Sequence, residues 1–123
     1  MPVMENIYTE LGPEALKQLV NTFYDEVVKS PIISQLFVND INEIKAKQYL
    51  FLTQFLGGPQ LYTQTYGHPR MRMRHLPHKI DEAAKNEWLR CMQFAVDSLA
   101  IDQELKLKLF GVFPPIAQHM VNS

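Results

Sequence analysis

The sequence predicts an all-α fold, and three observations lead to this prediction. Four segments carry apolar residues at the three- and four-residue spacing that places them on one face of a helix. A long connection of low periodicity separates the second of these segments from the third. No two strand-like segments follow one another across a tight turn, so the sequence offers no pair of strands from which a sheet would form.

The first predicted helix runs from Pro13 to Lys29. Proline suits the first turn of a helix, where the backbone amides have no partner within the helix. Tyr24 lies on the apolar face of this helix, so its hydroxyl points into apolar surroundings. Pro31 ends the helix. The residues of the apolar face are Leu16, Leu19, Val20, Phe23 and Val27.

The second predicted helix follows a short connector over residues 32–40 and ends at "GGP", residues 57–59, a helix-terminating sequence. Gln48 is the polar member of its apolar face, which is formed by Ile41, Ile44, Gln48, Phe51, Leu52 and Phe55. From Pro59 to Pro77 we expect a long connection with short helical turns near residues 60–65 and 71–75. A connection of this length inside a small domain is usually functional.

The third predicted helix begins after Asp81, whose carboxylate suits the N-cap position. Its apolar face is formed by Trp88, Cys91, Met92, Ala95, Val96 and Leu99. The last segment, residues 102–121, is predicted to be helical, although "LKLKL" alternates like a strand, because a single strand would have no partner. Pro114 and Pro115 predict a kink or break at Phe113.

Composition limits the possible classes of protein. A chain of 123 residues, 46% apolar and 20% charged, fits one folded domain over residues 1–123. The net charge of −1 argues against a nucleic-acid partner, since such binding depends on positive charge. The single cysteine, Cys91, excludes an internal disulfide and a cysteine-rich zinc site and favours a reducing compartment. Without a basic leader or a long apolar run, we expect a cytoplasmic protein with no membrane partner.

Three polar side chains, Tyr24, Gln48 and Trp88, fall on otherwise apolar helix faces. Burial of such a group without a partner costs about 1–3 kcal/mol. Each residue alone is more often part of a satisfied core than of a binding site. Together they are three hydrogen-bond donors on three helices, and this combination suits a small electronegative ligand in a mostly apolar pocket.

The stretch "GHPRMRMRHLPH", residues 67–78, combines histidines with arginines. A zinc site at His75 and His78 is poorly supported, because Pro77 disrupts a regular helix face and no cysteine or acidic cluster completes the ligands. A nucleophile or acid–base site lacks the accompanying motif. Plain solvated charge remains an open alternative. One imidazole flanked by arginines also suits haem, which needs an axial nitrogen for iron and cations for two propionates.

Three motifs in this order resemble one family: "FLTQFLGGPQLY" at residues 51–62, "GHPRMRMRHLP" at 67–77 and "EWLRCM" at 87–92. The sequence resembles the group II truncated haemoglobins, small bacterial and plant globins. The similarity extends from about Leu16 to the terminal "HMVN". It implies a single truncated globin domain, a 2-on-2 helical sandwich, around haem b, which is iron protoporphyrin IX.

On the proximal side, the resemblance implies that His75 is the haem iron ligand. Arg74 and Lys47 match positions that pair with the propionates, and Tyr62 matches a position that hydrogen-bonds a propionate. One departure from the family pattern is "HLPH", where His78 replaces an aromatic residue. We expect His78 to lie at the surface.

On the distal side, Trp88 matches the family's tryptophan, whose indole N–H reaches the bound ligand, and Tyr24 matches the distal tyrosine. Gln48 matches a further distal position that some members fill with glutamine. Phe37 matches the aromatic residue packed on the haem face. Ile44 stands where the residue that gates ligand entry is often small.

The resemblance implies binding of O2, NO, CO or peroxide. Donors in a dry pocket stabilise a bound ligand that carries partial negative charge, which predicts high affinity for O2. The implied activities are turnover of NO by bound O2, as in an NO dioxygenase, or peroxide reduction. The alternative is a reversible oxygen binder or sensor without turnover.

The chain has no glycine-rich fingerprint for flavin or nicotinamide, so any reductase is a separate protein. A cofactor-free helical interaction module would leave the three polar residues unexplained. Both a monomer and a homodimer are compatible with the sequence.

Overall fold

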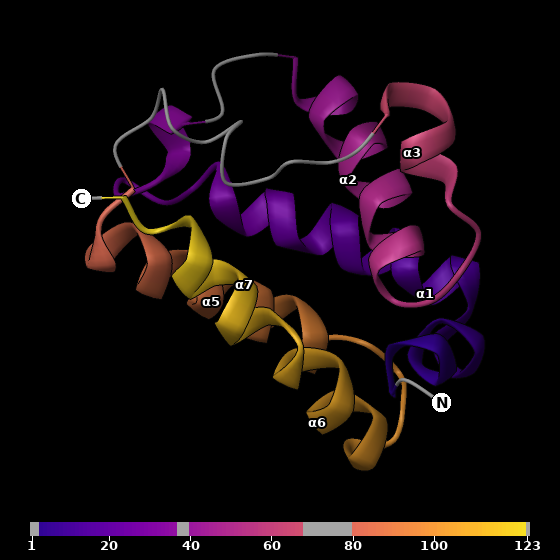
Figure 1. The fold of residues 1–123 in the computed structure, drawn as a ribbon. Helices are drawn as coiled ribbons and strands as arrows, with labels where there is room; N and C mark the ends of the chain where they lie inside the picture. Colours follow the sequence, from indigo (N-terminus) through magenta and orange to yellow (C-terminus); the bar gives the residue numbers. More distant parts are fainter. Residues whose placement is uncertain (1–2, 37–39, 68–79, 123) are drawn as a thin grey trace.

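The computed structural model describes residues 3–36, 40–67 and 80–122 (Figure 1). The described residues form helices and connections without a strand, which confirms the predicted all-α class. The α-helices are α1 (Val3–Val27), α2 (Ile41–Phe55), α3 (Leu61–Tyr66), α5 (Glu82–Asp97), α6 (Gln103–Gly111) and α7 (Phe113–Met120). A 3-10 turn, η1 (Ser34–Leu36), follows α1.

The helices pack in two layers. α1 and α2 pack against one another, and α3 packs on α2. α5 packs against α6 and α7 and also against α1, so α1 and α5 form the main contact between the layers (Figure 1). The core between them contains fully buried side chains from both layers, including Leu19, Phe23, Met92, Val96 and Phe113.

Helix α1 consists of two helical parts joined at a kink, and the predicted start at Pro13 is confirmed as the start of the second part, whereas the part before Gly12 was not predicted. Gly12 has φ 82° and ψ 158° and interrupts the helix, so Pro13 starts its second part. Residues with a side chain rarely adopt a positive φ, which explains why glycine stands there. Ile7 and Leu11 of the first part are buried in the core, four residues apart on one face.

Helix α2 ends as the "GGP" sequence predicts. The amide of Gly57 donates to the carbonyl of Gln54 at 3.1 Å, and the amide of Gly58 donates to the carbonyl of Thr53 at 2.8 Å. With Gly57 at φ 101°, this is the Schellman arrangement. A Cβ at Gly58 would lie 2.8 Å from both the Thr53 carbonyl oxygen and the Tyr8 ring, because the first part of α1 packs on this end.

The predicted helical turn near residues 60–65 is present as α3, whereas the turn predicted near residues 71–75 lies outside the described residues. Helix α5 has the predicted cap, since the carboxylate of Asp81 accepts from the amide of Ala84 at 2.8 Å. This cap fixes the beginning of the helix that carries Trp88.

The last segment is helical, and its break lies at Val112, one residue before the predicted position. "LKLKL" belongs to α6, as predicted. Pro114 and Pro115 stand in the first turn of α7, where their missing amides leave no hydrogen bond unmade. Among the helices described, none is both long and apolar enough to cross a bilayer.

Candidate functional site

Aromatic rings from both helix layers form one continuous series of contacts. The series begins at Tyr24 on α1 and ends at Tyr66 on α3. Its successive ring-centre distances lie between 4.8 and 6.5 Å. In order, the rings are Tyr24, Phe23, Trp88, Phe113, Phe55, Phe51, Tyr62 and Tyr66.

Phe23 joins two of the predicted donors. Its fully buried ring meets Tyr24 at 4.8 Å with an interplanar angle of 78° and meets Trp88 at 5.1 Å with an angle of 64°. Both are edge-to-face contacts, the geometry that the charge distribution of aromatic rings favours. The structure therefore brings Tyr24 of α1 and Trp88 of α5 against the same ring.

The environment of Tyr24 keeps its hydroxyl protonated. Its side chain is 3% exposed, and this burial raises the pKa of the phenol above its ordinary value of 10.0, because an apolar environment disfavours the anion. At neutral pH, Tyr24 therefore retains a proton that it can donate.

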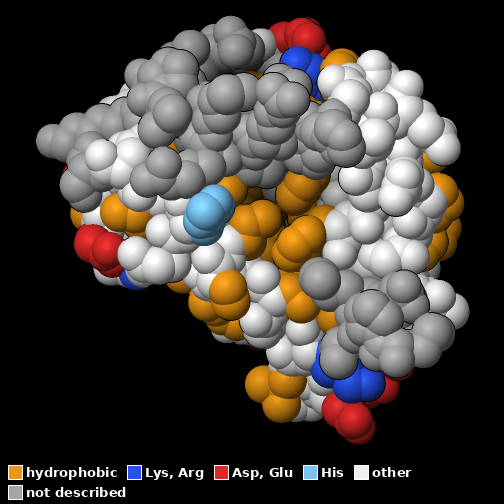
Figure 2. Space-filling model, in the orientation of Figure 1, with side chains coloured by type: hydrophobic (Ala, Val, Ile, Leu, Met, Phe, Trp, Pro, Cys, Tyr) orange, Lys and Arg blue, Asp and Glu red, His pale blue; other side chains and the backbone are white. Residues whose placement is uncertain are grey.

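Trp88 and Gln48 are half-buried. Within the part of the chain that the structure describes, neither the Trp88 indole N–H nor the Gln48 side-chain amide forms a hydrogen bond. Apolar side chains gather at the centre of one face of the molecule, beside the atoms that are not described (Figure 2). Donors that the described residues leave without a hydrogen bond, placed among apolar side chains, are what a pocket for a small polar ligand requires.

The predicted propionate contacts lie at the other end of the aromatic series. Tyr62 is buried and meets the rings of Phe51 and Tyr66. The Lys47 ammonium lies 5.2 Å from the centre of the Tyr66 ring and 3.9 Å from the Glu43 carboxylate. Both predicted residues therefore contact Tyr66, which the sequence analysis did not single out.

Ile44, the predicted gate residue, is half-buried on α2 and packs against the core. Phe37, Arg74, His75 and His78 lie outside the described residues, so the roles expected of them stay predictions.

A polar cluster between α1 and α5 was missed by the sequence analysis. Ser30 Oγ donates to Glu87 Oε2 at 2.5 Å. Arg90 donates to Glu87 through Nε at 2.7 Å and Nη2 at 3.0 Å, and reaches Glu26 at 3.4 Å. The bonds from Arg90 and Ser30 lower the pKa of the Glu87 carboxyl to about 2. Only the three-residue spacing of Glu87 and Arg90 was visible as a local pattern.

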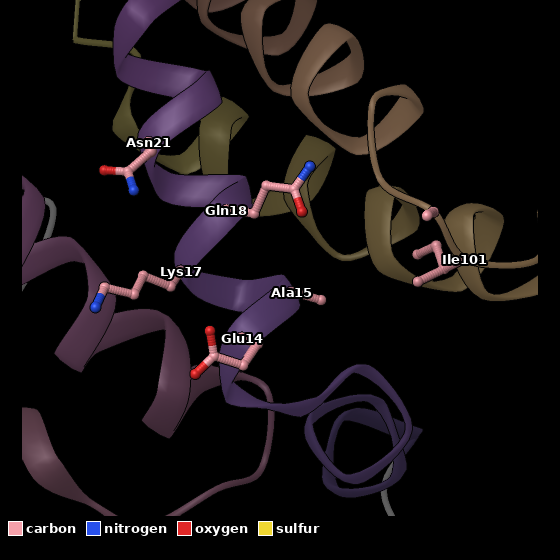
Figure 3. A pocket seen from close by; sticks show the side chains of 7 residues that line it. Glu14, Ala15, Lys17, Gln18, Asn21 and Ile101 are labelled. Carbon is pink, nitrogen blue, oxygen red and sulfur yellow. The ribbon is translucent and has the colours of Figure 1, made fainter.

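A separate depression of about 420 Å³ lies at α1 and the connection between α5 and α6 (Figure 3). It contains none of the predicted site residues. Its lining consists of Glu14, Ala15, Lys17, Gln18, Asn21, Ala100 and Ile101.

Comparisons with known proteins agree with one another. The family model of the bacterial-like globins matches residues 6–122. A group 2 truncated hemoglobin of Bacillus subtilis is 45% identical over 115 residues, which cover 94% of this chain and 87% of the relative. The X-ray structure of a truncated oxygen-avid haemoglobin from Bacillus subtilis superimposes with a TM-score of 0.90 at 45% identity and covers 94% and 98% of the two chains.

A second solved structure, the group II truncated hemoglobin from Bacillus anthracis, gives a TM-score of 0.90 at 41% identity and covers 95% of this chain and 96% of the other. Membership of the globin family implies haem, and the described residues fit such a group. They provide an aromatic lining, the donors of Trp88 and Gln48, which have no hydrogen-bond partner in the described part of the chain, and Lys47 at one edge. The chain therefore belongs to the bacterial-like globin family and is a group II truncated haemoglobin.

Proposed function

We propose that this chain holds haem b and binds O2 with high affinity, with Tyr24 and Trp88 as hydrogen-bond donors to the bound ligand. NO and CO are further diatomic ligands of the same pocket. The observation that carries the proposal is the junction at Phe23, where a ring of α1 and a ring of α5 meet one buried phenylalanine. This junction supports the assignment of both donors to one pocket.

Haem, when bound, would supply an iron that binds the diatomic ligand. In the proposal, His75 is the proximal ligand of this iron, and Phe37 packs on the haem face. Arg74, Lys47 and Tyr62 hold the propionates. The position of Lys47 and Tyr62 around Tyr66 supports this assignment, because it gathers a cation and a hydroxyl at one end of the aromatic series.

The distal residues act through their protons. The phenol of Tyr24 remains protonated because of its burial, and the indole N–H of Trp88 has no other partner among the described residues. Gln48 is a third donor in the proposal, and Ile44 narrows the entry for ligands. In a dry, apolar site, fixed donors stabilise partial negative charge more strongly than the same donors in water.

High affinity suits redox chemistry better than bulk oxygen transport. We propose oxidation of NO by bound O2, in which NO, O2 and one electron give nitrate and a separate reductase supplies the electron. Peroxide reduction is the second reaction that this pocket suits. The Bacillus subtilis relative whose structure is described as oxygen-avid supports the expected slow release of O2.

Replacement of Trp88 by phenylalanine tests the donor role. Trp88→Phe keeps an aromatic ring but removes the N–H, so O2 dissociation should become faster by about fivefold or more, which corresponds to the loss of a hydrogen bond of ~1 kcal/mol. Tyr24→Phe should act in the same direction. Tyr8→Phe is the matched control, because Tyr8 is a half-buried tyrosine outside the ring series that lies beside Gly58, just after the end of α2. Stopped-flow measurement of O2 release that finds Trp88→Phe equal to the parent would refute the donor role.

A second measurement separates turnover from reversible binding. The oxygenated protein is mixed with NO in the presence of a reductant, and the nitrate formed per chain is measured. Repeated turnover supports the proposed redox role. A stoichiometric yield with slow re-reduction would instead indicate a reversible binder or sensor.

A further inference from the structure

We infer that the polar cluster of Ser30, Glu87, Arg90 and Glu26, here called the α1–α5 clamp, positions the Trp88 donor opposite Tyr24, with Glu87 as the positioning residue. The inference rests on the proposed function, because it assigns a role to the clamp in ligand binding. The inference assigns the clamp no direct contact with the ligand. It acts through the orientation of α5 against α1.

Glu87 stands at the centre of the clamp. One carboxylate oxygen accepts from Ser30 at 2.5 Å and from Arg90 at 3.0 Å, while the other accepts from Arg90 at 2.7 Å. The Glu87 side chain is 11% exposed, and Ser30 is 3% exposed. Such charge-assisted, two-pronged bonds hold a specific geometry, since two parallel donors fix both the distance and the orientation of the carboxylate.

The α5 residues of the clamp bind two points at the end of α1, one in its last turn and one just beyond it. Arg90 reaches Glu26 in the last turn of α1 at 3.4 Å. Ser30 lies just beyond the helix, where its amide donates to the carbonyl of Val27 and its Oγ accepts from the amide of Ile32 at 3.2 Å. Because both points bind groups of α5, the end of α1 is tied to one turn of α5.

The clamp and the donors share the same turns of the two helices. Glu87 directly precedes Trp88 on α5, and Glu26 follows Tyr24 by two residues on α1. Successive helix residues are rotated by about 100°, so Glu87 and Trp88 face different sides of α5. Rotation or sliding of α5 against α1 would therefore loosen the clamp and move the indole N–H together, and hydrogen bonds weaken steeply once misaligned.

Exposed ion pairs generally contribute little to stability, and the Arg90 side chain is 52% exposed. Around Glu87 these exposed groups meet a half-buried carboxylate and a buried serine, and the bonds of such a network depend on one another. Because its ion pairs are exposed or half-buried, we expect the clamp to affect donor geometry more than the free energy of unfolding.

Glu87→Gln is the direct test, since glutamine keeps the shape of the side chain but cannot accept the guanidinium at both of its ends. Trp88 is the only tryptophan, so its indole gives one cross-peak in the nitrogen–proton NMR spectrum of the CO-bound protein. We expect this cross-peak to shift, split or broaden in Glu87→Gln, and O2 dissociation to become about threefold faster or more through the weakened donor.

Glu82→Gln is the matched control. Glu82 lies on the same helix and also pairs with the residue three positions later, Lys85, at 2.7 Å, but its other bond, at 3.1 Å, comes from Gln118 on α7. This variant removes an ion pair of the same three-residue spacing whose further bond goes to α7 and not to α1, although Glu82 is more exposed than Glu87. Its indole cross-peak and its O2 dissociation rate should match those of the parent, and its thermal midpoint should be close to that of Glu87→Gln.

An unchanged indole cross-peak or an unchanged O2 dissociation rate in Glu87→Gln, or an equal effect of Glu82→Gln, would overturn the inference. If Glu87→Gln does not fold, Arg90→Gln is judged by the same criteria, because it removes the guanidinium that bonds to both carboxylate oxygens and because Arg90 is exposed. Trp88→Phe separates the two proposals. If that variant releases O2 like the parent, the donor role fails, and the indole cross-peak still reports whether the clamp holds Trp88.

Discussion

Phe23→Leu tests whether one buried ring organises the junction of α1 and α5. Phe23 is fully buried and makes edge contacts with both Tyr24 and Trp88. Each aromatic contact contributes about 0.5–1.5 kcal/mol beyond area burial. The smaller, differently shaped leucine adds about 1 kcal/mol of packing loss, for a total decrease of about 2–4 kcal/mol in the free energy of unfolding.

Denaturant unfolding of the CO-bound protein measures this loss, and the thermal midpoint should fall by about 10 °C for a domain of this size. Phe94→Leu is the matched control, because Phe94 lies on α5 with 49% of its side chain exposed. It should change the free energy of unfolding by less than about 0.5 kcal/mol. If Phe23→Leu is no more destabilising than Phe94→Leu, the claim that the Phe23 ring organises the junction of α1 and α5 is wrong.

Two further predictions concern the close approach at Gly58, after the end of α2, and the ionisation of Tyr24. Gly58→Ala should lower the free energy of unfolding by about 1–3 kcal/mol, because the added Cβ would lie 2.8 Å from the backbone oxygen of Thr53. Denaturant unfolding measures this change, and an unchanged free energy of unfolding would contradict the close approach of the two atoms. Burial raises the pKa of Tyr24 in the folded state, so the stability it contributes is complete below pH 10.0 and declines at higher pH. When tyrosine ionisation is followed by absorbance as the pH rises, the titration curves of the parent and of Tyr24→Phe should therefore coincide up to the pH at which the protein unfolds. One additional tyrosine that ionises in the native parent would contradict this prediction.

The elements that local pattern determines were predicted well from the sequence. Apolar residues at helical spacing identified α2 and α5, Asp81 identified the start of α5, and "GGP" identified the end of α2. The first part of α1 was missed because Gly12 and Pro13 together have the pattern of a helix start. The structure shows that the chain before Gly12 is also helical and that it buries Ile7 and Leu11, which are four residues apart.

The residues of the site also fall into two groups, those that a local sequence pattern identifies and those that only the folded chain brings together. Tyr24 and Trp88 were identified because a polar group on an apolar face is a local anomaly, and the structure brings both to Phe23. The bond between Ser30 and Glu87 joins residues 57 positions apart, and no periodicity predicts which polar residues meet across such a distance. Long-range polar pairing depends on the packing of α1 against α5, so it becomes visible only in the folded chain.

The central claim is that this truncated haemoglobin holds haem through His75 in the pocket that contains Tyr24 and Trp88. Titration of the purified protein with haem tests it most directly, with His75→Ala and His78→Ala as a matched pair from one segment. We expect a strong Soret band at one haem per chain for the parent and for His78→Ala, and a lost or altered band for His75→Ala. A parent-like Soret band in His75→Ala would contradict it.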